Sequence, residues 1–414
     1  MATTPSIAMI PSGYKASKLY SVLPTDGTGD FTTSRASVAT RVNENGLIEE
    51  VAANVPRLDY SDGGCPSLLL EPASTNLIPY SEDFSNAYWT KRRSIITLSS
   101  VISPDGNLTA DKLVATAVND NHYLTTPTVA VTATTPIAFS IFVKKEVYSK
   151  IGFREGITGA QVSFNLNTKL KMYEAGCVIS YEDFGEFLKL KISYTSSSSG
   201  NAQWGIYVLD DSYTSGIPNA YDFIGDGTSG IYIWGAQLEE NSYATSYIKT
   251  LGTTQTRVAD TATGSGNSTV INSTEGVLYF EGSALANDGT NRMISLSNGV
   301  STNSNATLYF TTTPNQIRFV YEVSSVLQCS IISTIDVLQD NKFAIVYKLN
   351  RFELWGNGVK LGEDTSGSVN PSGTFTKLSF LRGSSQLPFY GKTKSVQVYT
   401  TALTDAELTT LTTI

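Results

Sequence analysis

Short segments in which apolar and polar residues alternate are the feature that most limits what this chain can fold into. Examples lie at 135–145, 187–196, 230–239 and 342–363, and Gly, Asn, Asp or Ser bounds them. A side-chain period of two over four to eight residues is typical of half-buried strands. No helical pattern of ten residues separates these segments. The sequence therefore predicts antiparallel sandwiches and not an alternating βαβ sheet.

Length and composition fit an all-β protein with more than one domain. A chain of 414 residues has room for two or three domains at roughly 150 residues each. Only 16% of the residues are charged, and the chain is rich in the Thr, Ser, Asn and Gly that suit strands and turns. We predict an all-β fold: two antiparallel β-sandwich domains of jelly-roll or concanavalin-like type in tandem, after an extended N-terminal segment.

A stretch of small polar residues suggests where the two sandwiches meet. Hydrophobicity falls sharply over 256–276, and we interpret residues 263–275 as a linker. The first sandwich then spans 61–262 and the second 276–414. Residues 1–60 contain strand-like pieces but no periodic core, so we expect them to be an attachment segment that packs on something else.

Two local motifs make definite structural predictions. Asn357-Gly358 lies between two strand patterns and predicts a tight hairpin. Thr404, with Glu407 three residues later, predicts a helix N-terminus with a capping box.

The segment "SLLLEP" at 67–72 predicts a strand that is buried on both faces and ends at Pro72. We expect the chain that follows to wrap across the first sandwich. We expect Tyr88 and Trp89 to pack into the edge of its core.

Net charge and cysteine spacing exclude several classes of function. A net charge of −8 disfavours nucleic acid and anionic membranes, and no segment approaches the roughly 20 apolar residues of a membrane span. The N-terminus lacks the pattern of a signal peptide, so we expect synthesis in a cytoplasm. Cys65, Cys177 and Cys329 lie too far apart for a metal motif and are expected to be free, buried thiols.

Several motifs in order resemble a known module. They are "RASVATRVNENGLIEEVAANVPRLDY", "LLLEPASTNLIPYSEDFSNAYWTK" and "IYIWGAQLEENSYATSYIKTLGTTQTRVAD". Together they cover roughly residues 34–260 and resemble a carbohydrate-binding-like module of bacteriophage tail-fibre, head-fibre and other virion proteins. The end of the chain, "FYGKTKSVQVYTTALTDAELTTL", is similar to the closing strand and short helix of laminin-G-like and concanavalin-like sandwiches.

The resemblance implies a place on a virus particle. The protein would be made in the host bacterial cytoplasm and assembled into the virion, where it would contact other virion proteins through its N-terminal segment. By analogy with phage fibres we expect a homo-oligomer, a trimer, whose closed symmetry shields edge strands such as the one at 316–323. Host or environmental polysaccharide would be the external partner.

The sequence offers little for catalysis. Its single histidine, His122, is expected in a surface loop, and no Gly-x-Ser-x-Gly, HExxH or P-loop motif is present. Acidic residues near one another could serve glycoside hydrolysis or, with Asp226, hold Ca²⁺. Thirty-seven acidic residues place such groups together by chance, so we predict no enzyme, no metal and no cofactor. The carboxylates in question are Asp210, Asp211, Glu182, Asp183 and Glu186.

Aromatic residues beside turns are the candidates for binding. A sugar ring stacks its C–H face on Tyr or Trp while amides and carboxylates bind its hydroxyls. Trp204 and Trp234 alternate with apolar strand residues and are expected in the core. The candidate glycan-binding residues are Tyr123, Tyr213, Tyr221 and Trp355. Two functions stay open, a glycan-binding adhesin and a purely structural virion protein, with a polysaccharide depolymerase as a third.

Overall fold

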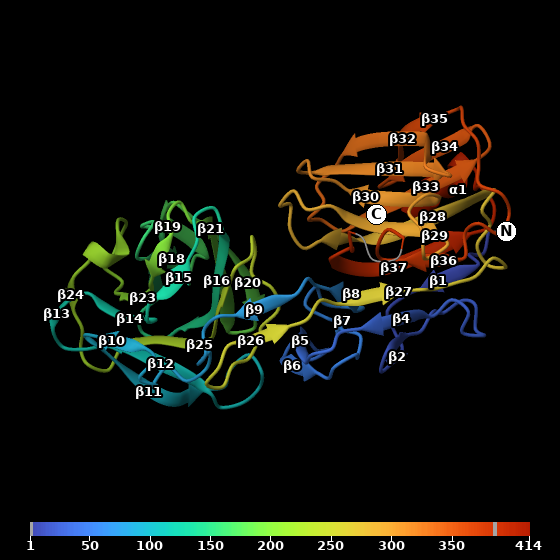
Figure 1. Ribbon diagram of the computed structural model, residues 1–414. Helices are drawn as coiled ribbons and strands as arrows, with labels where there is room; N and C mark the ends of the chain where they lie inside the picture. The colour runs from blue at the N-terminus through green and yellow to red at the C-terminus, as the bar shows by residue number, and fades with distance from the viewer. Residues whose placement is uncertain (1–2, 384–386) are drawn as a thin grey trace. The chain divides into compact units, whose positions relative to one another are not determined.

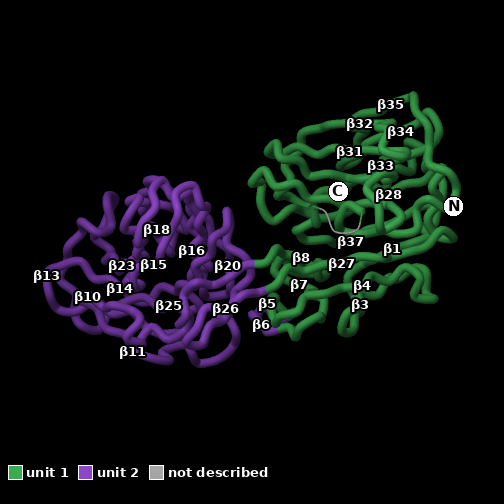
Figure 2. Tube along the Cα trace, in the orientation of Figure 1, with its two compact units in different colours: residues 1–44, 51–73, 258–414 green, residues 45–50, 74–257 purple. Residues whose placement is uncertain are grey.

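A computed structural model describes residues 3–383 and 387–414. It is almost entirely β-structure, and in these ranges the one α-helix is α1 (Asp405–Thr412). The chain divides into two compact units (Figures 1 and 2). Unit 1 comprises the described residues of 1–44, 51–73 and 258–414, and unit 2 comprises 45–50 and 74–257. Across the described residues no helix is long and apolar enough to cross a membrane.

This division differs from the boundaries expected from the sequence. Unit 2 is an insertion in unit 1, which includes the N-terminal strands, the segment up to residue 73 and the expected linker. The physical reason is long-range strand pairing, because β8 (Ser67–Leu70) pairs with β37 (Gly391–Tyr399). Ser265 and Ile271 are fully buried, so residues 263–275 are part of a packed domain and not a linker.

Unit 1 is a sandwich of two large antiparallel sheets (Figure 1). The eight-stranded sheet has the order β35-β34-β33-β28-β37-β8-β7, with β1 also pairing with β37, and the five-stranded sheet has the order β32-β31-β30-β29-β36. A smaller sheet, β2-β3-β4-β27, belongs to the same unit. Their bounds are β1 Ile7–Met9, β2 Tyr14–Lys15, β3 Lys18–Leu19, β4 Phe31–Ser34, β7 Leu58–Asp59, β27 Thr261–Thr263, β28 Glu275–Ala284, β29 Arg292–Ser297, β30 Asn305–Phe310, β31 Gln316–Val323, β32 Val326–Thr334, β33 Asn341–Lys348, β34 Arg351–Gly356, β35 Val359–Asp364 and β36 Lys377–Ser379.

The N-terminal strands complete the core of unit 1. Ile7, Met9 and Leu19 are fully buried in the same cluster as residues of β28, β31 and β37. The expectation that the first 60 residues form a separate attachment segment is therefore corrected, since their apolar side chains are core residues of this sandwich.

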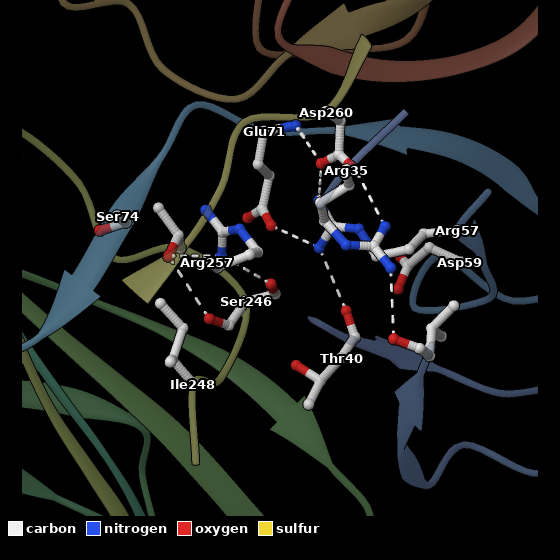
Figure 3. Close-up of polar contacts among 12 residues, drawn as sticks. Arg35, Thr40, Arg57, Asp59, Glu71, Ser74, Ser246, Ile248, Arg257 and Asp260 are labelled. Carbon is white, nitrogen blue, oxygen red and sulfur yellow. Dashed lines mark hydrogen bonds and ion pairs between the residues drawn. The ribbon is translucent and has the colours of Figure 1, made fainter. Parts of the chain in front are cut away.

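Buried ion pairs join the two points where the chain leaves and re-enters unit 1 (Figure 3). Arg57 donates from Nη1 to Glu71 Oε2 at 2.6 Å and from Nη2 to Asp260. Arg35 Nη1 lies 3.0 Å from Asp260 Oδ1, and the Glu71 backbone N–H donates to Asp260 Oδ2 at 3.0 Å. Buried charges require such pairing, and here it fixes residue 71 against residue 260.

Unit 2 is a second sandwich, made of two six-stranded antiparallel sheets (Figure 1). We call them the β23 sheet, with the order β10-β14-β23-β17-β18-β19, and the β16 sheet, with the order β11-β12-β25-β16-β21-β20. Their bounds are β10 Thr90–Arg92, β11 Ser94–Val101, β12 Ala110–Ala115, β14 His122–Thr125, β16 Pro136–Lys145, β17 Lys150–Glu155, β18 Gln161–Asn165, β19 Leu170–Ala175, β20 Val178–Phe184, β21 Phe187–Thr195, β23 Trp204–Leu209 and β25 Gly230–Glu239.

The remaining strands form short two-stranded antiparallel sheets. In unit 2 these are β9 with β26, β13 with β24 and β15 with β22, and the turn between β5 and β6 contains the first passage from unit 1 to unit 2. Their bounds are β5 Ala39–Val42, β6 Ile48–Val51, β9 Ser74–Asn76, β13 Asn119–Asp120, β15 Val129–Val131, β22 Gly200–Ala202, β24 Phe223–Ile224 and β26 Gln255–Arg257, and a 3₁₀-helix η1 spans Pro218–Ala220.

The structure confirms the all-β fold, the two antiparallel sandwiches and both local motifs. Asn357 and Gly358 connect β34 to β35, and Thr404 and Glu407 form the expected capping box. The strand at 67–70 is buried on both faces, as expected, although it lies in unit 1 while the residues after it enter unit 2.

Three further expectations met different outcomes. Trp204 and Trp234 are core residues as predicted, and Trp89, which was expected at the edge of the core, is fully buried in it, with Tyr88 half-buried against it. The segment at 316–323 is not an edge strand, because β31 lies between β32 and β30. Cys65 is exposed, whereas the other two cysteines are buried free thiols.

Candidate functional site: a tyrosine-rich outer face on unit 2

The β23 sheet has one face in the core and one face outside it. Along β23, Ile206 and Val208 pack in the main core of unit 2, whereas Tyr207 and Leu209 belong to a separate aromatic cluster. Successive side chains of a strand point to opposite faces. The cluster around Tyr207 therefore lies on the outer face of this sheet.

Strand register shows which residues share that face. Tyr207 lies opposite Tyr123 on β14 and opposite Gly152 on β17, and residues directly opposite one another share a face. Two residues along the strand, and so on the same face, Gly205 lies opposite Thr125 and Arg154. We call this surface the tyrosine face. It comprises Arg92, Tyr123, Thr125, Gly152, Arg154, Gln161, Ser163, Tyr173, Gly205 and Tyr207.

The loop 210–222 covers one half of the tyrosine face. Tyr213 donates its hydroxyl to Ser163 Oγ at 2.9 Å, and its ring meets that of Tyr221 edge-on at 5.0 Å. Pro218 lies over Gly152 so closely that a Cβ there would stand 2.5 Å from Pro218 Cβ. A glycine at residue 152 is thus what lets the loop lie on the sheet.

The other half of the tyrosine face carries half-buried side chains and an aromatic pair. The rings of Tyr123 and Tyr207 have centroids 4.7 Å apart at 31°, and a Cβ on Gly205 would lie 2.7 Å from Tyr207 Cε2, so the Tyr207 ring extends across that glycine. Burial raises the pKa of Tyr207 to about 12. Tyr123, Arg154 and Gln161 are half-buried, and we call this region the open half.

The open half has the chemistry of a sugar-binding surface. Tyrosine rings offer an apolar face with a polar tip, and Arg154, Gln161 and Thr125 supply donors and acceptors beside them. The Tyr207 ring itself lies across Gly205 and is 5% exposed, so the accessible aromatic side chain of the open half is Tyr123. Such a surface can stack a pyranose and bind its substituents without any reacting group.

The structure brings together three of the four candidate residues. Tyr123, Tyr213 and Tyr221 all belong to the cluster on the outer face of the β23 sheet. Their exposure differs from expectation, because Tyr213 is only 1% exposed and acts as packing beneath the loop. Tyr221 is half-buried, and its hydroxyl donates to Asp210. Of the three, Tyr123 faces the open half.

Trp355 is not part of this site, and its expected exposure is wrong. It lies in unit 1 on the outer face of the eight-stranded sheet, in a cluster with Leu403 and Leu408 of the C-terminal segment. Its Nε1 donates to Glu353 Oε2 at 2.8 Å, and Lys360 Nζ stands 5.4 Å from the ring centroid. The side chain is 4% exposed, because α1 and Lys360 cover it.

Reasoning from the sequence missed Tyr207 and Arg154. Both lie in the middle of strands, and the search favoured aromatic residues beside turns. A signal was present: in "WGIYVL", Tyr207 has the opposite phase to Trp204, Ile206 and Val208. A large aromatic residue on the polar phase of a strand indicates an outer-face aromatic.

The residues considered for catalysis or metal binding have structural partners. His122 is not in a surface loop; it is fully buried in β14, and its ring nitrogens lie near the backbone oxygens of Arg93 and Phe223. Asp226 accepts the backbone N–H groups of Thr228 and Ser229 at 2.8 and 2.6 Å, and hydrogen bonds from Ser229 and Thr228 hold its pKa far below the usual range.

The acidic residues near β20 and the 210–222 loop are also partnered. Glu182 and Glu186 form ion pairs with Lys191 and Lys144 at 2.7 and 2.6 Å, and Asp183 pairs with Lys169. Asp211 accepts from Ser149 Oγ at 2.7 Å. In the part of the chain that the structure describes, no three His, Cys, Asp or Glu side chains are placed to hold a metal ion.

Comparisons give structural likenesses at low scores. No protein-family model matches the chain, and no curated protein matches its sequence. A carbohydrate-binding module, CBM40, of a Ruminococcus gnavus sialidase bound to α2,3-sialyllactose is 18% identical and covers 37% of this chain and 94% of its own, with a TM-score of 0.31. Domain 4 of the arabinanase AbnA from Geobacillus stearothermophilus, in complex with arabinotriose, is 14% identical over 42% of this chain and 84% of its own, with a TM-score of 0.31.

Domains LG4-5 of the mouse laminin α1 chain are 10% identical over 70% of this chain and 90% of their own, with a TM-score of 0.24. At these scores the function has to be argued from the residues of the tyrosine face itself.

Proposed function

We propose that this protein binds polysaccharide without cleaving it, through the open half of the tyrosine face. One observation carries the proposal: the half-buried Tyr123 ring lies on an outer sheet face, backed by the buried Tyr207 ring and beside the half-buried polar side chains of Thr125, Arg154 and Gln161. Packing of the sandwich does not require such a surface, whereas a sugar can stack on it.

The affinity of one site for a sugar is expected to be weak. A flat sheet face buries little of a saccharide, and binding must displace water from its hydroxyls. Several copies on one particle would raise the apparent affinity through avidity. This fits the second part of the proposal, that the protein lies on the surface of a bacteriophage virion as a fibre or decoration, for which the quoted sequence resemblance is the support.

Exposed apolar side chains on edge strands support the proposed homo-oligomer, and the analogy with phage fibres is the support for a trimer. Ile95 and Leu98 on β11, and Leu327 and Ile332 on β32, are about half exposed, and both strands are sheet edges. Edge strands with exposed apolar residues invite pairing with another chain. The attachment to other virion proteins would use the exposed Ile10, because Ile7 and Met9 are core residues.

A glycan array tests the binding proposal. Wild-type protein should bind a subset of bacterial or environmental polysaccharides, and Tyr123→Ala should weaken the signal. Tyr14→Ala, a change at an exposed tyrosine of unit 1, is the matched control and should bind normally. Absence of any signal for the multimeric wild type would exclude the proposal. Shortening of a polysaccharide during incubation would show an enzyme instead and return attention to Asp210, Asp211 and Glu186.

The β11 edge also favours a second function, a purely structural role between subunits. If that is the whole function, Leu98→Asp should abolish assembly in sedimentation, while particles that lack the protein adsorb normally to host cells. Normal adsorption of such particles would favour the structural role over the adhesin.

A further inference from the structure

Tyr207 is buried, although it lies on the same face of the sheet as the accessible Tyr123. Its side chain is 5% exposed, whereas Tyr123 is half-buried. The two residues lie directly opposite one another on β23 and β14. A residue with so little exposure offers a ligand almost no surface. Any role of Tyr207 in binding must therefore act through a neighbouring side chain.

Tyr123 is such a neighbour, because its ring packs against the Tyr207 ring. The two ring centroids are 4.7 Å apart and the ring planes are inclined at 31°. At this separation aromatic rings attract one another beyond the gain from burial. The buried ring thus backs the half-buried one, and contact on that side restricts the rotamers that the Tyr123 side chain can adopt.

Gly205 determines where the Tyr207 ring can lie. It precedes Tyr207 by two residues on β23, and so lies on the same face of the sheet. A Cβ at residue 205 would lie 2.7 Å from Cε2 of Tyr207 and 3.2 Å from its hydroxyl oxygen. The ring therefore occupies space that any larger residue at position 205 would fill.

We propose that Tyr207 is a positioning residue for sugar binding, which holds the Tyr123 ring in the orientation that stacks on a sugar, and that Gly205 provides the space for it. This inference rests on the proposed function. A side chain that is fixed before binding loses less conformational entropy when the ligand arrives. The open half thus uses two tyrosines for one stacking surface, the buried one as support and the half-buried one as the contact.

A double-mutant cycle in titration calorimetry tests the inference, with the strongest-binding oligosaccharide of the glycan array as the probe. Tyr207→Leu keeps an apolar side chain but not the flat ring. It should weaken binding about 3- to 10-fold, the size expected when one ordered side chain becomes mobile. Tyr207→Phe keeps the ring and should bind as the wild type does. In a Tyr123→Ala background, Tyr207→Leu should cause no further loss, because its effect acts through Tyr123.

Gly205→Ala tests the same support without altering either tyrosine. The new Cβ would displace the Tyr207 ring, so binding should weaken by a similar factor. Gly156→Ala is the matched control, because its Cβ would meet nothing closer than 3.6 Å, and it should bind as the wild type does. Thermal unfolding identifies any variant that fails to fold.

A measurement without ligand gives an independent test. Three-bond NMR coupling constants of the Tyr123 side chain should show a single χ1 rotamer in the wild type and in Tyr207→Phe. In Tyr207→Leu the same coupling constants should show averaging over several rotamers.

The outcomes separate this inference from the proposed function. Weaker binding in Tyr123→Ala together with normal binding in Tyr207→Leu would overturn the positioning role and leave polysaccharide binding in place. A further loss in the double variant would also overturn it, because Tyr207 would then act by a route other than Tyr123. A single χ1 rotamer of Tyr123 in Tyr207→Leu would contradict it without any ligand. No binding of any saccharide by the wild type would overturn both proposals.

Discussion

Both units carry an aromatic cluster on the outside of a sheet, and they differ in what covers it. In unit 1, Tyr279 and Trp355 lie on the outer face of the eight-stranded sheet, and the C-terminal segment with α1 packs over them. In unit 2, Tyr213 and Pro218 of the loop 210–222 pack over Ser163 and Gly152 of the sheet, and Tyr123 is left half-buried. The same kind of cluster is thus fully covered in one sandwich and only partly covered, at Tyr123, in the other.

The comparison teaches that an aromatic residue's role depends on which segment returns to cover it. Unit 1 recruits distant parts of the chain, including β1 at its N-terminus and α1 at its C-terminus, to close its faces. Unit 2 is built from one continuous insertion with a short ribbon before it. Predictions about the two units test whether the covered face serves stability and the open face serves binding.

The largest expected effect is the loss of unit 1 when residues 1–30 are deleted. The deletion removes Ile7, Met9 and Leu19, all fully buried. At about 1.5–3 kcal/mol for each side chain, the loss of roughly 5–9 kcal/mol approaches the total stability of a domain. Calorimetry should show the unfolding transition of unit 1 lost and that of unit 2 retained. Two unchanged transitions would show that the N-terminal strands are dispensable.

Truncation of the covered tryptophan is the next largest. Trp355→Ala should lower the free energy of unfolding of unit 1 by about 3–5 kcal/mol, because it leaves a cavity beneath α1. Denaturant unfolding measures this loss, and glycan binding should be unchanged. Trp355→Phe is the control. It should cost less stability, because Phe keeps an aromatic ring beneath α1, although the hydrogen bond to Glu353 is lost. A loss of binding with normal stability would mean that Trp355 is a contact residue after all.

Much of the fold could be predicted from the sequence, because strand alternation is a local signal. The segments at 135–145 and 230–239 correspond closely to β16 and β25. The partners of a strand are not a local property. Leu68 pairs with Thr393, and nothing in either segment specifies the other. The insertion of unit 2 and the role of the first 60 residues could not be read from the pattern for that reason.

The site was also predictable only in part, because contacts between distant segments decide which aromatic residues are covered. Turn positions led to Tyr123, Tyr213 and Tyr221, and the fold brings these three into one cluster. Which of them would be covered depends on Pro218 meeting Gly152, a contact between segments far apart in sequence. Coverage of Trp355 depends in the same way on α1. Sequence alternation indicates an outer face but not the segment that lies on it.

Displacing the covering loop of unit 2 should have an intermediate effect. Gly152→Ala places a Cβ 2.5 Å from Pro218 Cβ, so the loop must move, at a cost of about 1–3 kcal/mol. Chemical denaturation measures the cost, and limited proteolysis should show faster cleavage within 210–222. Gly156→Ala is a matched control on the same segment, since its Cβ would meet nothing closer than 3.6 Å. Equal behaviour of the two variants would mean that the loop is not held by this contact.

The two units should also differ in their response to pH. Burial raises the pKa of Asp111 in unit 2 to about 6, whereas the buried Glu71 and Asp260 of unit 1 are paired with Arg57. A folded-state pKa above the unfolded value means that the native state binds the extra proton. The contribution of Asp111 to the stability of unit 2 is then most favourable below about pH 4 and falls by about 2 kcal/mol, after allowance for screening, as the pH rises to about 6.

Thermal unfolding at pH 4 and pH 7 measures this difference. Asp111→Asn should remove the part of the stability loss of unit 2 between pH 4 and 6 that comes from Asp111, and should make unit 2 more stable at pH 7. If the variant keeps the wild-type pH profile, another group titrates in this range and Asp111 is not its source.

The smallest effect on stability, and the most informative about function, is expected at Tyr123. Tyr123→Ala removes the accessible ring of the tilted pair in the open half. Because the side chain is half-buried, the free energy of unfolding should fall by no more than about 1.5 kcal/mol. Affinity for a polysaccharide found on the array should fall about tenfold, equivalent to 1.4 kcal/mol, in titration calorimetry. Tyr123→Phe keeps the ring and should retain most of the affinity. If the alanine variant binds as tightly as the wild type, the open half is not the binding surface, and the contrast between a covered and an open aromatic face has no functional meaning.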